Sequence, residues 1–142
     1  MRIAHTGPVV SFEAPAITWQ RPLPLQTRFE PGCGCDAQAL RRGLAALATD
    51  PTVQALVVFG SRAQGQGLRE SDLDLAVICC DDSLSPELKT DRSFHYRQVL
   101  GDVGCGVDLV VQGWRDAAHL AGSRWHVMGD VARYGQVLYV AG

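Results

Sequence analysis

Two almost continuously apolar runs, separated by a polar loop that contains glycine, constrain the fold of this chain more than any other feature. The first run is VQALVVF at Val53–Phe59, and the second is LDLAVICC at Leu73–Cys80. Apolar runs of this length, without the alternation of a half-exposed strand, are typical of strands that are covered on both faces. We therefore expect two buried strands joined by the loop.

Aspartates mark the start of the second run. Asp72 and Asp74 are two residues apart on an extended segment, so their carboxylates point to the same face. Two such charges about 4 Å apart repel each other by roughly 4 kcal/mol at an effective dielectric constant near 20. Asp74 also lies between two leucines, and buried carboxylates are rare unless they are paired or bound to a metal. The pattern favours a site for a divalent cation.

A third aspartate repeats this pattern further along the chain. Asp108 lies inside the apolar run VDLVV at Val107–Val111. If its strand neighbours the one that begins at Leu73, three carboxylates converge at the strand ends. Two divalent ions bridging them would polarise a phosphoryl oxygen and favour attack by a hydroxyl group. The alternative is that these acids pair with arginines, although buried ion pairs stabilise a fold poorly.

Gly60 and Ser61 directly follow the first apolar run. A glycine there lets the backbone approach a ligand, and the serine adds a hydroxyl and an N–H. If a helix begins near Arg62, its exposed N–H groups favour an anion such as a triphosphate. An ordinary strand-to-helix turn explains the same residues. The phosphate loop G-x-x-x-x-G-K-[ST] is absent, so a P-loop NTPase is not expected.

Residues 1–35 differ from the rest of the chain in composition. They hold five of the seven prolines, and proline at this density prevents helix and interior strand. We expect an extended N-terminal arm with short edge strands at residues 9–12 and 16–19. Residues 36–142 are then a single domain.

The pattern after the arm predicts an α/β (α+β) domain, a small mixed sheet with helices packed on it. One helix follows Asp36, a credible N-cap, and another runs from Pro86 to about Val103. The remaining expected elements are two short helices and a last strand, over residues 114–120, 124–134 and 137–140. The large aromatic side chains of the short helices are expected to fill the core: Trp114, Trp125 and Tyr134.

The five cysteines do not resemble a disulfide framework, because their number is odd and their spacing irregular. Cys79, Cys80 and Cys105 are expected to be free thiols in or near strands. Cys33 and Cys35 form a C-x-C in a glycine-containing loop, but no second pair stands at metal-ligand spacing. The sequence leaves the role of this C-x-C open.

Charge and hydropathy exclude several classes of function. A net charge of −2 over 142 residues gives no reason to expect direct binding to nucleic acid or to an anionic membrane. The N-terminus lacks the apolar core of a signal peptide, and nothing approaches eighteen uninterrupted apolar residues. We therefore expect a cytoplasmic protein.

The spacing of the singled-out residues resembles the polymerase-β-type nucleotidyltransferase superfamily. Gly60-Ser61 precedes Asp72-x-Asp74 by a ten-residue gap, and Asp108 follows inside an apolar strand. Within the superfamily, the short chain and the wording GSRAQG…SDLDLAV resemble the minimal nucleotidyltransferases, the MNT or MntA-like proteins. The resemblance covers roughly residues 36–140 and implies a nucleotidyltransferase fold. The proline-rich arm departs from the family pattern.

The resemblance implies a role for each carboxylate. Asp72 and Asp74 would hold two Mg²⁺ ions that bridge the phosphates of ATP. Asp108 would be the third ligand, on the catalytic ion, and would accept the proton of the attacking hydroxyl.

It also implies how the triphosphate is held. Gly60 and Ser61 would grip the β- and γ-phosphates, and Arg62 would neutralise their charge. No motif position fixes Arg69, which is expected to be a solvated surface residue.

The resemblance finally implies an acceptor. Aminoglycoside-modifying relatives carry an additional helical domain, for which no room is expected after Val140. In the minimal group that half is commonly a separate helical HEPN protein, and the pair resembles a toxin–antitoxin system in which AMP passes from ATP to a tyrosine of the toxin. We therefore expect protein AMPylation by an antitoxin.

Two alternatives remain open. In the first, the chain is a nucleotidyltransferase that acts on a small hydroxylated molecule such as an aminoglycoside. In the second, it is a non-catalytic binding module that neutralises its partner by contact. The sequence leaves the preferred NTP open, and it does not distinguish a homo-oligomer from a hetero-oligomer.

Overall fold

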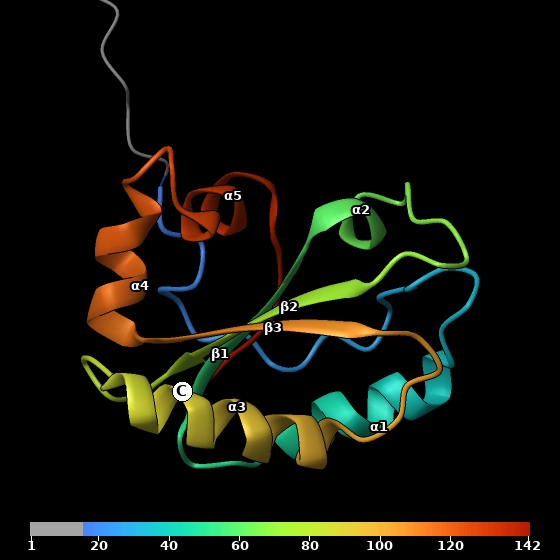
Figure 1. Cartoon of the computed structure of the whole chain (residues 1–142), viewed down its shortest axis with the longest axis horizontal. Helices are drawn as coiled ribbons and strands as arrows, with labels where there is room; N and C mark the ends of the chain where they lie inside the picture. Colours follow the sequence, from blue (N-terminus) through green and yellow to red (C-terminus); the bar gives the residue numbers. More distant parts are fainter. Residues whose placement is uncertain (1–15) are drawn as a thin grey trace, which may run out of the picture.

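The computed structural model describes residues 16–142, which form a four-stranded sheet with helices on both faces (Figure 1). In chain order the elements are α1 (Ala37–Ala48), β1 (Val53–Phe59), α2 (Gly60–Ala63), β2 (Leu73–Cys79), α3 (Pro86–Leu100), β3 (Val107–Gly113), α4 (Trp114–Ala121), α5 (Val127–Tyr134) and β4 (Gln136–Val140). Across the sheet the strand order is β3-β2-β1-β4. β2 and β3 are parallel, whereas β1 is antiparallel to β2 and to β4, so the sheet is mixed, as predicted.

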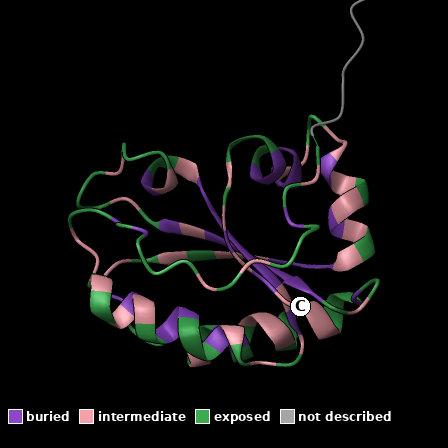
Figure 2. Cartoon of the chain, turned by 180° about the vertical axis from the view of Figure 1, so that it is seen from behind, coloured by how far each residue is buried: buried purple, intermediate pink, exposed green. Residues whose placement is uncertain are grey.

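The two apolar runs of the sequence are the two central strands. Both β1 and β2 are buried along almost their whole length, which Figure 2 shows in purple. Alternate side chains of each strand enter two separate core clusters. Leu56 and Val58 pack with α1 and α3 on one face, and Ala55 and Val57 pack with α4 and α5 on the other. Burial on both faces explains why these strands are apolar at every position.

The first helix begins where the sequence predicted. The Asp36 carboxylate accepts hydrogen bonds from the backbone N–H groups of Gln38 and Ala39, both at 3.1 Å. This caps α1 in the usual way. Gly43 allows α1 to approach α3 closely, because a Cβ there would collide with the backbone of Leu100. α3 ends at Leu100, three residues earlier than predicted.

The segment before α1 is part of the folded domain. Trp19 is fully buried in the core cluster that includes α4 and α5. Leu23 and Val140 exchange backbone hydrogen bonds of 3.0 and 2.9 Å, and Gln26 N–H donates to the Leu138 carbonyl at 2.8 Å. These contacts cover the outer edge of β4, which would otherwise present unpaired backbone groups. The strand predicted at residues 16–19 does not form, and the one at residues 9–12 lies outside the described residues.

A disulfide corrects the prediction for the cysteines. Cys35 is bonded to Cys105 across a sequence separation of 70 residues, with a Cα–Cα distance of 5.0 Å. The bond joins the loop before α1 to the segment that leads into β3. Cys33, Cys79 and Cys80 are free. A pair so distant in sequence has no local spacing signal, and for that reason Cys105 was expected to be a free thiol.

Within residues 16–142, none of the helices combines the length and the apolar character that a membrane span requires.

Candidate functional site

Strand register brings the three predicted aspartates to one face of the sheet. Asp74 and Asp108 are direct partners in the parallel β2–β3 ladder. Asp72 lies two residues before Asp74 and therefore points to the same face. Phe59 pairs with Asp74 on the other side of β2, so Gly60 and Ser61 follow at the same edge. Figure 1 shows α2 beside the start of β2.

Two glycines make room for two of the carboxylates. A Cβ at Gly60 would collide with Oδ2 of Asp74, and a Cβ at Gly106 would collide with Oδ1 of Asp72. Gly60 also has a φ of +75°, which other residues adopt only at a cost. Gly106 stands opposite Asp72, directly before β3. The sequence did not indicate a role for Gly106, because the side chain that needs this space belongs to a distant residue, and such a contact leaves no local pattern.

The electrostatics of the acids are uneven. Asp74 is half-buried, and its pKa is raised first by burial and then by the negative charges of Asp108 and Asp72. Asp72 and Asp108 are exposed. The expectation that Asp108 is a buried carboxylate is therefore wrong, because β3 is an edge strand that solvent reaches at this end.

The alternative from the sequence was that these acids pair with arginines, and none of the salt bridges formed between residues 16–142 joins Asp72, Asp74 or Asp108 to an arginine. The ion pairs formed between described residues involve other acids, namely Glu30, Asp50, Asp81 and Asp82. Three carboxylates that share a face and lie outside the salt bridges of the described residues suit a cation.

The donor set fits Mg²⁺ better than it fits a closed structural metal site. Within residues 16–142, no group of three histidine, cysteine, aspartate or glutamate side chains forms a ready-made metal cage. Mg²⁺ rarely uses such a cage, since it is usually held by one or two carboxylates together with water and substrate phosphates. Asp74 and Asp108 in register, with Asp72 beside them, supply these carboxylates at the edge where Gly60 and Ser61 lie.

The structure places Arg62 differently from the predicted phosphate contact. Its side chain is 2% exposed, and its guanidinium donates hydrogen bonds of 2.7–3.2 Å to five backbone carbonyls, those of Pro31, Cys33, Leu68, Arg69 and Ser71. A guanidinium has five N–H donors, so none is left for a phosphate. Arg62 therefore connects α2 to two loops, the one before α1 and the one between α2 and β2, and it fixes the position of Gly60 and Ser61.

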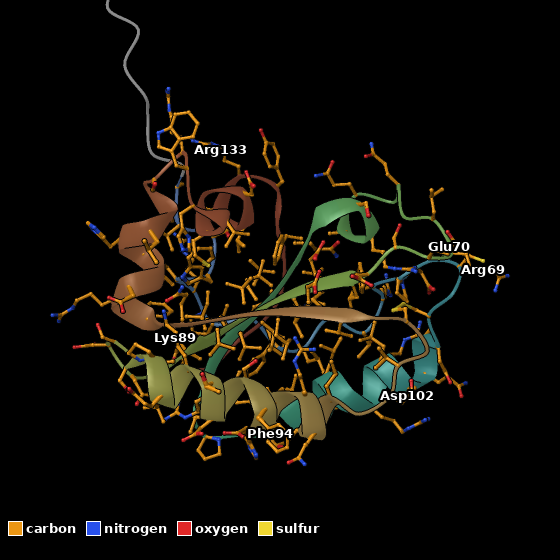
Figure 3. The ribbon with its side chains drawn as sticks, in the orientation of Figure 1. Arg69, Glu70, Lys89, Phe94, Asp102 and Arg133 are labelled. Carbon is orange, nitrogen blue, oxygen red and sulfur yellow. A yellow bond between two sulfur atoms is a disulfide. The ribbon has the colours of Figure 1, made fainter. Side chains whose placement is uncertain are left out.

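Arg69 and Ser61 are both exposed. Arg69 is exposed at the tip of the loop between α2 and β2, next to Glu70, and both are labelled in Figure 3. Ser61 is exposed in the first turn of α2.

A cavity of about 330 Å³ opens directly beside Asp74. It is lined by Phe59, Gly60, Gln64, Asp74, Asp130 and Tyr134. Asp130 and Tyr134 were not predicted as site residues. Tyr134 was expected in the core, as was Trp125, but they are 59% and 89% exposed. The only sequence signal was that Asp130 and Tyr134 are four residues apart and therefore lie on one side of a helix.

Comparison with known proteins adds a family. The family model described as Polymerase beta, Nucleotidyltransferase matches residues 44–123, a span that contains all the predicted site residues. No curated protein matches the chain.

Solved structures that are similar to part of this chain include the following three. One is from a crystal structure of a toxin–antitoxin with AMP-PNP, with 25% identity, a TM-score of 0.46, and coverage of 69% of this chain and 70% of that one. Another is from a mutant of the toxin–antitoxin MntA-HpeT, at 22% identity, a TM-score of 0.45 and the same coverage. A third is a putative nucleotidyltransferase from Sulfolobus solfataricus, at 14% identity and a TM-score of 0.43, covering 72% of this chain and 77% of that one.

Proposed function

Because this chain belongs to the polymerase beta nucleotidyltransferase family, we propose that it transfers AMP from ATP to a hydroxyl group of a partner protein. The observation that carries the proposal is the register of the sheet. It sets Asp74 beside Asp108, with Asp72 on the same face and Gly60 at the same edge. Carboxylates gathered beside a glycine-containing turn suit a metal-assisted reaction at a phosphate.

The reaction is a single displacement at the α-phosphorus of ATP. The acceptor oxygen forms a bond to this phosphorus while the bond to the bridging oxygen breaks, and pyrophosphate leaves. Asp108 takes the proton of the acceptor hydroxyl. Its exposure at the start of an edge strand lets a hydroxyl on a large partner reach it.

The other site residues bind and orient the nucleotide. Asp72, Asp74 and Asp108 would hold Mg²⁺, which would neutralise the phosphates and make the α-phosphorus more electrophilic. Gly60 lets the backbone approach the β- and γ-phosphates, and Ser61 offers its hydroxyl and N–H to them. Arg62 keeps this turn in place from behind.

The acceptor follows from the sequence resemblance to the minimal nucleotidyltransferases. We propose a tyrosine of a helical HEPN-type toxin, with this chain as the antitoxin in the cytoplasm. An adenylate on that tyrosine adds negative charge and bulk, and both disable a ribonuclease site.

Mass spectrometry tests the proposal. The chain is incubated with Mg²⁺, ATP and the protein encoded beside it, and the partner is weighed before and after. We expect a mass gain that matches AMP, which disappears with EDTA and with Asp108→Asn. Because Asp108 is exposed, we expect Asp108→Asn to unfold at the same temperature as the wild type, which thermal unfolding checks.

Two results would replace the proposal. Transfer to an aminoglycoside with none to the protein would identify a small-molecule enzyme. Neutralisation of the partner that survives Asp108→Asn unchanged would identify a binding module.

A further inference from the structure

The cavity beside Asp74 has two walls of different character. One wall is the end of β1 and the start of α2, with Phe59, Gly60 and Gln64. The opposite wall is α5, which contributes Asp130 and Tyr134. A volume of about 330 Å³ lies within the range of small-molecule sites. The cavity therefore has room for one part of a nucleotide beside the carboxylates.

The wall formed by α5 is rigidly anchored. Met128 and Val131 are fully buried in the core, and Ala132 is nearly so. The backbone after the helix also packs closely, because a Cβ at Gly135 would collide with Val57 of β1. One side of α5 is therefore packed in the core, while Asp130 and Tyr134 are exposed and line the cavity.

Charge decides which part of a nucleotide this cavity accepts. Two of its lining side chains, Asp74 and Asp130, are carboxylates, and the lining includes no lysine or arginine among the described residues. Asp74 is the one that would share Mg²⁺ with the phosphates. Asp130 lies on the other wall, where a carboxylate repels a phosphate and attracts a hydrogen-bond donor. The cavity therefore suits the uncharged part of the nucleotide, its nucleoside.

We propose that this cavity is the nucleoside subsite, in which the ring of Tyr134 stacks on the base and Asp130 accepts a hydrogen bond from the exocyclic amino group. The inference rests on the proposed function for its nucleotide, and it assigns the residues that select the base. A tyrosine that is 59% exposed on the wall of a cavity offers a flat apolar surface for a base. An ionised carboxylate only accepts hydrogen bonds, so it favours an amino group and repels a keto oxygen at the same position.

Equilibrium binding tests the proposal without any acceptor protein. The probes are α,β-methylene ATP and its inosine counterpart, each with Mg²⁺, which differ in a single amino or keto group. Tyr134→Ala is expected to weaken binding of the ATP analogue by about 10- to 100-fold, whereas Tyr134→Phe keeps the ring and binds as the wild type does. The wild type is expected to prefer the ATP analogue by about 10-fold or more. Asp130→Asn reduces that preference, because an amide both donates and accepts.

Matched controls come from the opposite side of the sheet. Phe94, labelled in Figure 3, is an aromatic residue of α3 that is 64% exposed, and Asp91 on the same helix is an exposed carboxylate. Phe94→Ala and Asp91→Asn are expected to leave both affinities unchanged. The four substituted residues are all exposed, so each variant is expected to fold, and thermal unfolding is the check.

The outcomes separate this inference from the proposed reaction. If Tyr134→Ala binds the ATP analogue as tightly as the wild type, or if Asp130→Asn keeps the full preference, the nucleoside subsite is refuted. If the variants behave as expected but no AMP reaches the partner protein, the subsite stands and the proposed acceptor is refuted. If the wild type binds neither analogue, both are refuted.

Discussion

Replacing Gly60 with alanine tests the geometry of the carboxylate site most directly. The added methyl group has two effects, because Gly60 has a φ of +75° and because its Cβ would collide with Oδ2 of Asp74. Gly65 offers a matched control. Its φ is +72°, and a Cβ there meets nothing within 4 Å. The two variants therefore share the backbone cost and differ in the displacement of Asp74.

The structure gives a magnitude for each effect. A left-handed backbone costs an alanine about 1–2 kcal/mol, so both variants are expected to lose that much stability. The Cβ of Gly60→Ala stands less than 3.0 Å from Asp74, and ordinary contact begins at 3.4 Å. The carboxylate must therefore retreat by roughly 1 Å. A misplacement of that size costs about 100-fold in rate, or about 2.7 kcal/mol of activation free energy.

Two measurements distinguish these effects. Urea unfolding reports the backbone cost, which is expected to be equal in Gly60→Ala and Gly65→Ala. The rate of AMP transfer is expected to fall by about 100-fold in Gly60→Ala only. Because a methyl at Gly60 also faces the phosphates, Mn²⁺ affinity without nucleotide isolates the displacement of Asp74, and it is expected to fall as well. Equal Mn²⁺ affinity and equal rates in the two variants would refute the reasoning.

Three further perturbations follow from the described contacts. Arg62→Met leaves five carbonyls without their donor and is expected to lower the free energy of unfolding by roughly 3 kcal/mol or more, measured in urea. Cys35→Ser opens a link across 70 residues, so the loop-entropy relation gives a loss of about 4 kcal/mol, and the variant's stability should no longer respond to a reductant. Burial and the charges of Asp108 and Asp72 raise the pKa of Asp74 above its ordinary value of 3.8. The metal-free folded state therefore binds more protons than the unfolded state, and it loses stability as the pH rises above 3.8. Asp74→Asn removes this loss, so in EDTA near neutral pH the variant should have a higher Tm than the wild type. Added Mg²⁺ should raise the Tm of the wild type only.

Features that depend on local periodicity were predictable from the sequence. The unbroken apolar runs predicted that the two central strands are buried. The position of Asp36 directly before a helical pattern predicted that it caps the helix. The shared face of Asp72 and Asp74 follows from the period of a strand alone. Asp108 required one assumption, that its strand is a neighbour of β2, and the register of the sheet supplies it.

Features that depend on distant segments were not predictable. An arginine that follows Gly-Ser in a polar loop has the same local sequence whether it faces a phosphate or five backbone carbonyls. The carbonyls that bind Arg62 come from residues up to 31 positions away. Tyr134 is a large aromatic residue of the kind usually found in a core, but its side of α5 faces a cavity instead of the sheet. Local patterns do not specify which neighbour covers a side chain.

The loop directly before α1 contacts the candidate site at two places. Pro31 and Cys33 hold Arg62, whose own position sets Gly60 and Ser61. Cys35 is bonded to Cys105, three residues before Asp108. The same short loop thus contacts the turn proposed to bind phosphate on one side and the strand of the proposed proton acceptor on the other. A boundary at residue 35 would cut both connections, so the functional unit of this chain includes the loop that precedes α1.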